Sequence, residues 1–179
     1  MKVLLNFGES PAWLRDSRNL ALCLKRTLEA LVEYNRMYLQ AHRGVPLLYQ
    51  SGVRYREEPA RHAVLVMQTA GFSGRVEEFA SIPAILARGW ADCDDLAPYR
   101  AAELIEVFGE PAGIRVDWQP TGSGRLFHIT VRRVDPKTGQ LHDKSPIEDP
   151  SAKLGMYSAV ERKLPIQYRP ITPTYVKRL

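Results

Sequence analysis

The feature that most constrains the fold is a helical pattern over residues 93–108 that gives way to two alternating segments. Apolar residues recur there at three- and four-residue spacings with small alanines between them, and Gly109 ends the pattern. Residues 114–118 and 126–134 then alternate apolar and polar side chains, as half-buried strands do. A helix followed by an antiparallel meander predicts an α+β fold.

A second helical pattern occupies residues 13–42. Leucines recur on one face and charged residues on the others, which predicts a long amphipathic N-terminal helix. A break near Asp16–Ser17 is an alternative, and Gly44 and Pro46 end the pattern. Cys23 lies beside the apolar stripe, so we expect it to serve in packing.

The remaining segments carry weaker patterns. Residues 3–7 favour a short strand, and residues 76–88 favour helical turns interrupted at Pro83. Residues 45–62 mix turn-forming residues with tyrosine and arginine, which fits either a plain surface connector or a segment that lines a cleft. Residues 151–156 favour one more helical turn.

Length and composition predict one domain. A chain of 179 residues is long enough to bury its own core. Its hydrophobic share of 45% and charged share of 25% are typical of globular proteins. We assign residues 1–156 to a single domain with its core at 80–156. Residues 157–179 form a basic, proline-containing tail, which should be extended and ordered only where a neighbour holds it.

Charge and hydropathy limit the partners. The net charge of +5 is mild, and basic residues do not cluster with aromatic ones before the tail, so nucleic-acid binding is not expected. The first 13 residues are too short for a secretory signal and no apolar run reaches membrane-spanning length, so we expect no membrane contact. Two cysteines make no disulfide framework, which indicates synthesis in a reducing cytoplasm.

Residues that carry chemistry concentrate at Gly89–Leu96, where Cys93 begins the helical pattern. A helix N-terminus stabilises a thiolate, and its free N–H groups can hold an oxyanion. His128 on a strand is the candidate base, and Asp149 before Pro150 is the candidate that orients the imidazole. Each residue alone also has a plain structural interpretation. Together, in this order, they predict a thiol acyl-transfer triad.

Aspartates flank the thiol at positions 92, 94 and 95. Carboxylates raise the pKa of a neighbouring thiol, but they are also good helix-capping residues, so we give Asp94 and Asp95 no catalytic role. With His128 the aspartates also offer metal ligands. Zinc sites usually show paired cysteine or histidine at short spacing, and this sequence has no such pair. We therefore predict no metal and no organic cofactor.

Four segments follow one another along the chain: Gly89–Ala97, Gly113–Val116, Phe127–Val131 and Ile147–Pro150. Together they resemble the transglutaminase-like superfamily. In that family a Gly-x-Cys-x-Asp type turn opens the nucleophile helix, histidine stands in a strand, and aspartate precedes proline or threonine. The resemblance covers about residues 80–156. It implies a papain-like fold, with the nucleophile helix packed on an antiparallel β-sheet, and a triad of Cys93, His128 and Asp149.

Two details refine the resemblance. Glu148–Ser151 followed by Leu154–Met156 is similar to small proteins encoded by tailed bacteriophages and prophages among their virion structural genes. Asp94 stands directly after the cysteine, where eukaryotic transglutaminases have an aromatic residue, and their calcium sites and extra domains do not fit this length. Asp92–Leu96 also matches the Asp-Cys-x-x-Leu pattern that begins the cysteine motif of the papain-like cell-wall endopeptidases. The Ser-Gly that usually follows their cysteine is missing here.

Two functions stay open from the sequence. One is thiol acyl transfer or amide hydrolysis on a protein or peptide substrate. The other is a virion structural or assembly protein, of the head–tail connection or the tail, that keeps the fold with little or no catalysis. In the second case the C-terminal tail would bind other virion proteins. We expect synthesis in the host bacterial cytoplasm without export by a signal peptide, followed in the second case by incorporation into the virion.

Overall fold

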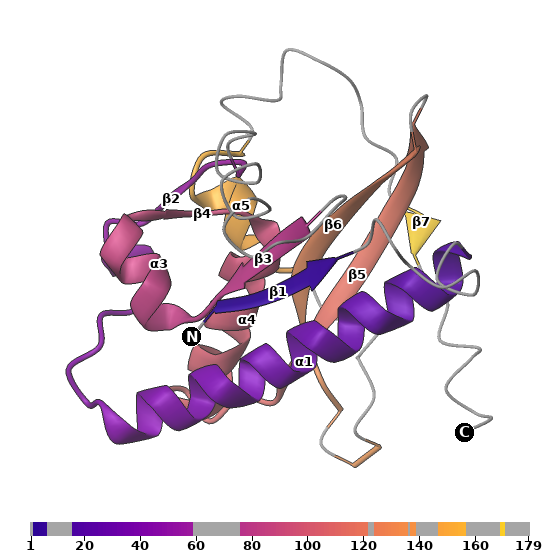
Figure 1. Ribbon diagram of the computed structural model, residues 1–179. Helices are drawn as coiled ribbons and strands as arrows, with labels where there is room; N and C mark the ends of the chain where they lie inside the picture. Colours follow the sequence, from indigo (N-terminus) through magenta and orange to yellow (C-terminus); the bar gives the residue numbers. More distant parts are fainter. Residues whose placement is uncertain are drawn as a thin grey trace.

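The architecture is mixed α+β, as the sequence predicts. A long N-terminal helix, α1 (Ser17–Ala41), lies across a central helix, α4 (Cys93–Glu106), and a small antiparallel sheet (Figure 1). The computed structural model describes residues 2–6, 16–58, 76–121, 124–135, 137–138, 147–156 and 169–170.

Helix α1 begins where its cap allows. The Asp16 carboxylate accepts the backbone N–H groups of Arg18 at 2.7 Å and Asn19 at 3.4 Å, which satisfies the first turn. The helix therefore starts at Ser17, the position of the predicted break. Residues 13–15 of the predicted helix lie outside the described residues. Neither this helix nor another among the described residues is long and apolar enough to cross a membrane.

The N-terminal strand pairs with a segment that the sequence pattern assigned to helix. Strand β1 (Lys2–Asn6) runs antiparallel to β3 (Val76–Ala80). The prediction of helical turns from residue 76 was therefore wrong for this strand. Phe79 is fully buried and Glu78 is 5% exposed, so neighbouring side chains on both faces of β3 are covered. Such burial removes the alternation that marks a half-buried strand.

Pro83 begins a helix rather than interrupting one. Helix α3 (Ile82–Arg88) carries this proline in its first turn, where the missing N–H costs no hydrogen bond. Gly89 ends the helix with φ of 72°, and its N–H donates to the Ile85 carbonyl at 2.9 Å. Strand β4 (Trp90–Ala91) follows at once and leads into α4.

The irregular segment after α1 pairs with other elements of the domain, so it is more than a plain connector. It contains one turn of 3-10 helix, η2 (Leu48–Gln50), and a short strand, β2 (Arg54–Tyr55). Strand β2 runs parallel to β4, with Tyr55 opposite Ala91. The Tyr55 N–H also donates to the Leu154 carbonyl at 2.9 Å. This segment therefore joins the approach to α4 with the C-terminal part of the domain.

The two predicted strands form one hairpin. Strand β5 (Ala112–Thr121) pairs antiparallel with β6 (Gly124–Arg133) along its whole length. The loop predicted over 120–124 is shorter than expected, because the pairing extends to Thr121 opposite Gly124. On one face of β6 the apolar residues point into the core, as predicted. The opposite, polar face is buried too: His128, Thr130 and Arg132 are 6%, 3% and 9% exposed.

The two edges of the hairpin carry different neighbours. On the free edge of β6, Val131 exchanges two backbone hydrogen bonds with Glu148, of 2.9 and 3.0 Å. The next residue, Asp149, caps α5 (Pro150–Lys153), the predicted extra turn. On the outer edge of β5, the tail strand β7 (Arg169–Pro170) pairs antiparallel. The rest of the predicted tail lies outside the described residues.

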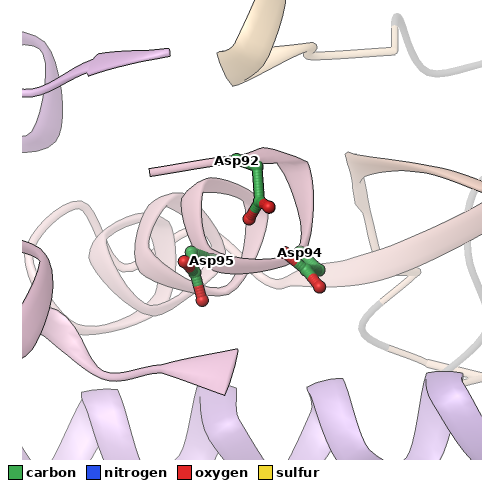
Figure 2. A group of neighbouring side chains, drawn as sticks. All are labelled: Asp92, Asp94 and Asp95. Carbon is green, nitrogen blue, oxygen red and sulfur yellow. The ribbon is translucent and has the colours of Figure 1, made fainter. Parts of the chain in front are cut away.

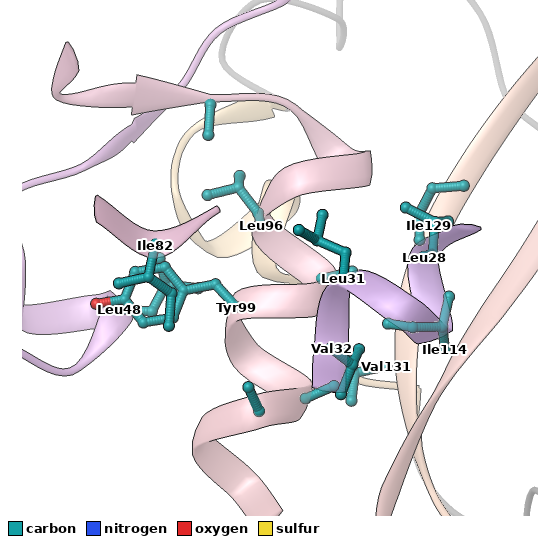
Figure 3. Packing of buried hydrophobic residues seen from close by; sticks show 14 of the residues in the cluster. Leu28, Leu31, Val32, Leu48, Ile82, Leu96, Tyr99, Ile114, Ile129 and Val131 are labelled. Carbon is teal, nitrogen blue, oxygen red and sulfur yellow. The ribbon is translucent and has the colours of Figure 1, made fainter. Parts of the chain in front are cut away.

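The core lies between α1, α4 and the hairpin. Figure 3 shows side chains from these three elements meeting there, with α3 and η2 closing one side. Helix α4 contributes Leu96 and Tyr99, both fully buried, and contacts α1, both strands of the hairpin, α5, η2 and β3. The helix that carries Cys93 is therefore held on all sides. Other buried members of the cluster are Leu28, Leu31, Val32, Leu48, Ile82, Ile114, Ile129 and Val131.

Candidate functional site

Cys93 is the first residue of α4, as the sequence predicts. The thiol lies against the edge of β6, where the backbone N–H of Ile129 donates toward the sulfur. The helix N-cap is Asp92, whose side chain makes no capping hydrogen bond. The first-turn N–H groups, which have no partner inside the helix, are therefore not capped by that carboxylate.

His128 and Asp149 contact each other directly. His128 Nε2 lies 2.7 Å from Asp149 Oδ2, although the residues are 21 positions apart. The other carboxylate oxygen of Asp149 accepts the Ala152 N–H at 3.0 Å, which is the cap of α5. Both side chains are largely covered, with 7% of His128 and 18% of Asp149 exposed. Asp149 thus starts a helix and holds an imidazole at the same time.

The electrostatics of Asp149 match that arrangement. Burial alone would raise the pKa of Asp149, but the hydrogen bond and charge of His128 and the N–H groups of Ala152 and Ser151 hold the pKa below its usual value. The carboxylate is therefore ionised at neutral pH. An ionised carboxylate only accepts hydrogen bonds, so we assign the proton between the two groups to Nε2.

The surroundings of the Cys93 thiol disfavour its ionised form. Burial raises the pKa of Cys93 well above the usual thiol range, the charges of Asp92, Asp149 and Asp95 raise it further, and the Ile129 N–H lowers it only in part. The sulfur is therefore a protonated thiol at rest. The helix N-terminus does not overcome burial and the nearby carboxylates, so the predicted stabilisation of a thiolate is not what this site provides.

The flanking aspartates do not behave as simple capping residues. Figure 2 shows Asp92, Asp94 and Asp95 around the first turn of α4, and one carboxylate oxygen from each lies within 4.8 Å of the others. The Asp95 carboxylate accepts the Ala80 N–H at 2.6 Å and contacts the Arg88 guanidinium, so it ties α4 to β3 and α3. Burial, and then the charge of Asp92, raise the pKa of Asp94 well above its usual value.

Metal ligation would fall to Asp92 and Asp94. Each has a buried Oδ1 atom without a hydrogen-bond partner within the described part of the chain, whereas the two oxygens of Asp95 are engaged. Buried carboxylates this close together disfavour ionisation of all three at once. The arrangement lowers the charge of the cluster by holding a proton. The absence of a metal stays a prediction from the sequence.

Three features of the site escape sequence reasoning. The Ile129 N–H acts through the backbone, which no side-chain pattern reveals. Tyr55 is partly buried, and burial followed by the charge of Cys93 raises the pKa of its hydroxyl, which places it in electrostatic range of the thiol. Only the aromatic content of residues 45–62 hinted at a role for Tyr55. Glu148, described below, stood in the matched motif without an assigned role.

Comparisons of the chain with protein-family models, with characterised proteins and with solved structures found no match. The geometry of the site therefore carries the functional argument.

Proposed function

We propose that this protein is a cysteine-nucleophile acyl-transfer or amide-hydrolysing protein of the transglutaminase-like, papain-like kind. Its triad would be Cys93, His128 and Asp149. The observation that carries the proposal is the 2.7 Å contact between His128 and Asp149. Both the Asp149 charge and the backbone N–H of Ile129, the residue after His128, act on the Cys93 thiol, which puts the pair within electrostatic range of the sulfur. A base with its orienting carboxylate beside a thiol is what nucleophilic thiol chemistry requires.

The reaction would proceed on an amide of a protein or peptide. As the sulfur of Cys93 bonds to the carbonyl carbon, the thiol proton passes to Nδ1 of His128, since Nε2 faces Asp149. Backbone N–H groups at the start of α4 would hold the oxyanion. Cleavage of the C–N bond then releases the amine, which takes the proton from the imidazolium and leaves a thioester. Water or a second amine attacks the thioester and restores the thiol.

The raised pKa of Cys93 selects one version of this chemistry. A resting thiolate–imidazolium pair is disfavoured by burial and by the carboxylates of Asp92 and Asp149. His128 would therefore act as a general base during the attack rather than beforehand. Simple alkylating reagents, which react with thiolate, should label Cys93 slowly at neutral pH.

The raised pKa of Cys93 also supports a second candidate function, an assembly protein that keeps the fold for binding. A virion head–tail or tail protein of the kind that the sequence resembles needs no activated thiol. The pairing of the tail residues Arg169–Pro170 with the edge of β5 favours this candidate as well, because it demonstrates that the tail can add a strand to a sheet edge. A neighbouring virion protein could receive the tail in the same manner.

An acyl-type electrophile separates the two candidates. The protein is treated with a peptide thioester, and acylation of each cysteine is followed by intact mass and peptide mapping. Cys23, the other free cysteine, is an internal control. We expect acylation at Cys93, absent in Cys93→Ser and slowed about 10²–10⁴-fold in His128→Ala.

Acylation of Cys93 at an equal rate in His128→Ala would remove the triad argument. Inertness of Cys93 toward the thioester, combined with co-purification of the protein with phage particles, would favour the assembly candidate.

A further inference from the structure

Glu148, the residue before Asp149, is held from several sides. Its backbone is bonded in both directions to Val131 on β6. Its carboxylate accepts the Tyr49 hydroxyl at 2.8 Å and the Arg100 Nε at 2.7 Å, and Lys153 Nζ lies at 3.3 Å. Burial alone would raise the pKa of Glu148, but the hydrogen bonds from Arg100 and Tyr49 and the charges of Arg100 and Lys153 hold it below its usual value.

Arg100 connects this carboxylate to the helix that carries the thiol. It lies on α4 seven positions after Cys93, two helical turns along. Its guanidinium also pairs with Glu103 at 3.0 Å and lies over the Tyr49 ring at 5.0 Å. The Glu103 carboxylate in turn accepts the Leu48 N–H. Arg100 is only 14% exposed, so its position is fixed by η2, α4 and Glu148 together.

The strand geometry transmits this anchoring to Asp149. Residues opposite each other in an antiparallel pair share a face, so Glu148 lies on the face of Val131, toward α4. Consecutive residues of an extended segment point to opposite faces, so Asp149 points to the face of His128. Any shift of Glu148 along or away from β6 would therefore move the Asp149 carboxylate relative to the imidazole.

We propose that Arg100, Glu148 and Tyr49 are positioning residues of the candidate site. They fix the nucleophile helix against the strand edge on which the His128–Asp149 pair is built. The inference rests on the proposed function for its consequence in catalysis, but its geometric part stands without it. Loss of such support typically lowers activity about tenfold to a hundredfold, because small displacements of reacting groups are costly.

The test compares Arg100→Met with a matched control, Arg36→Met. Arg36 Nε pairs with Glu106 at 2.6 Å and ties α1 to the C-terminal end of α4. Like Arg100, it therefore forms an ion pair through Nε with a glutamate distant in sequence, but this pair lies at the end of α4 away from Cys93. We expect Cys93 acylation by the peptide thioester to slow about tenfold to a hundredfold in Arg100→Met at saturating reagent, and to stay near the original rate in Arg36→Met. Arg100→Lys, which keeps the charge, should recover part of the loss.

A second readout does not depend on activity. The imidazole proton held between His128 and Asp149 should give a downfield proton NMR signal, identified by its disappearance in His128→Ala. We expect this signal to shift or broaden in Arg100→Met and in Glu148→Gln, and to be preserved in Arg36→Met. Among the described residues, two carboxylates lie on the face of this ring: Asp149 at Nε2, and the cross-strand neighbour Asp117, which pairs with Arg115.

The two readouts separate the two proposals. An unchanged signal together with an unchanged acylation rate in folded Arg100→Met would overturn the positioning role and leave the triad intact. A signal that moves only in Arg100→Met and Glu148→Gln, in a protein whose Cys93 is never acylated, would uphold the positioning role and remove the proposed function.

Discussion

Replacement of Glu103 by alanine offers a sharp test of how α4 is held. The side chain of Glu103 is 1% exposed, and its carboxylate accepts a hydrogen bond from the Leu48 N–H and pairs with Arg100 at 3.0 Å. Glu103→Ala would leave a buried N–H without an acceptor and remove one of the two carboxylates that balance Arg100.

The expected cost follows from that burial. Breaking a buried ion pair by removing one partner costs about 3–5 kcal/mol. For a protein of this length, each kcal/mol lowers the midpoint of thermal unfolding by about 2–4 °C, so we expect a fall of about 6–20 °C. The chain contains a matched control in Glu33, which pairs with Arg36 at the same sequence spacing of three and at 2.9 Å, but is 62% exposed. Glu33→Ala should cost about 0.2–1 kcal/mol.

The assay is thermal unfolding followed by circular dichroism at pH 7, with urea unfolding to obtain the free energy. Glu103→Gln adds a test of the charge. Burial raises the pKa of Glu103 in spite of the Leu48 and Arg100 hydrogen bonds. A carboxyl group whose folded pKa is raised contributes stability at low pH that is lost as the pH rises through that pKa. The cost of Glu103→Gln should therefore shrink as the pH rises above about 4.5.

Equal losses of stability for Glu103→Ala and Glu33→Ala would refute the reasoning, since Glu103 differs from Glu33 in its burial and in its hydrogen bond from the Leu48 N–H. A cost of Glu103→Gln that grows from pH 5 to pH 8 would refute the assignment of the pKa.

Three further predictions concern the site and its approach. Asp94→Asn should become increasingly stabilising from pH 5 to pH 8 in urea unfolding. The reason is that ionisation of the buried Asp94 beside Asp92 destabilises the fold as the pH rises through its raised pKa. A difference in unfolding free energy between variant and original protein that stays constant with pH would contradict this. Asp149→Asn should destabilise fully at pH 7 and progressively less as the pH falls below about 3.8, because the lowered pKa of Asp149 gives stability that protonation removes. Gly89→Ala should cost about 1–2 kcal/mol in thermal unfolding, because φ is 72° although nothing lies within 4 Å of an added Cβ. Gly44→Ala, equally free of contacts and without the positive φ, is its control and should change stability by less than about 0.5 kcal/mol.

The elements that the sequence predicted well are those with a strong local signal. The stripe of α4 ends near Gly109, whose φ of 65° explains the stop, and the alternation in β5 and β6 reflects one apolar face in the core. The order of Cys93, His128 and Asp149 also anticipated the contact between the last two residues. The helical stripe and the strand alternation are signals that lie within a few neighbouring residues.

What could not be predicted depends on partners far along the chain. Strand β3 is a strand because β1 pairs with it, and its two buried faces hide the alternation. The polar face of β6 is covered, although His128 and Thr130 alternate like solvated residues. The high pKa of Cys93 arises from burial first, then from the charge of the adjacent Asp92, and also from Asp149, which comes near the thiol only in the folded chain. No local spacing encodes any of these contacts.

The tie between Tyr49 and Glu148 has a consequence for biosynthesis. The two residues lie 99 positions apart, so their contact closes a loop that contains α4 and the hairpin. Because a ribosome delivers the chain from the N-terminus, α4 and its thiol emerge well before the segment that bears Asp149. Contacts of such long range form slowly. A nascent or truncated chain would thus carry Cys93 without His128 and Asp149, and the site would assemble only after the segment that bears Asp149 has emerged.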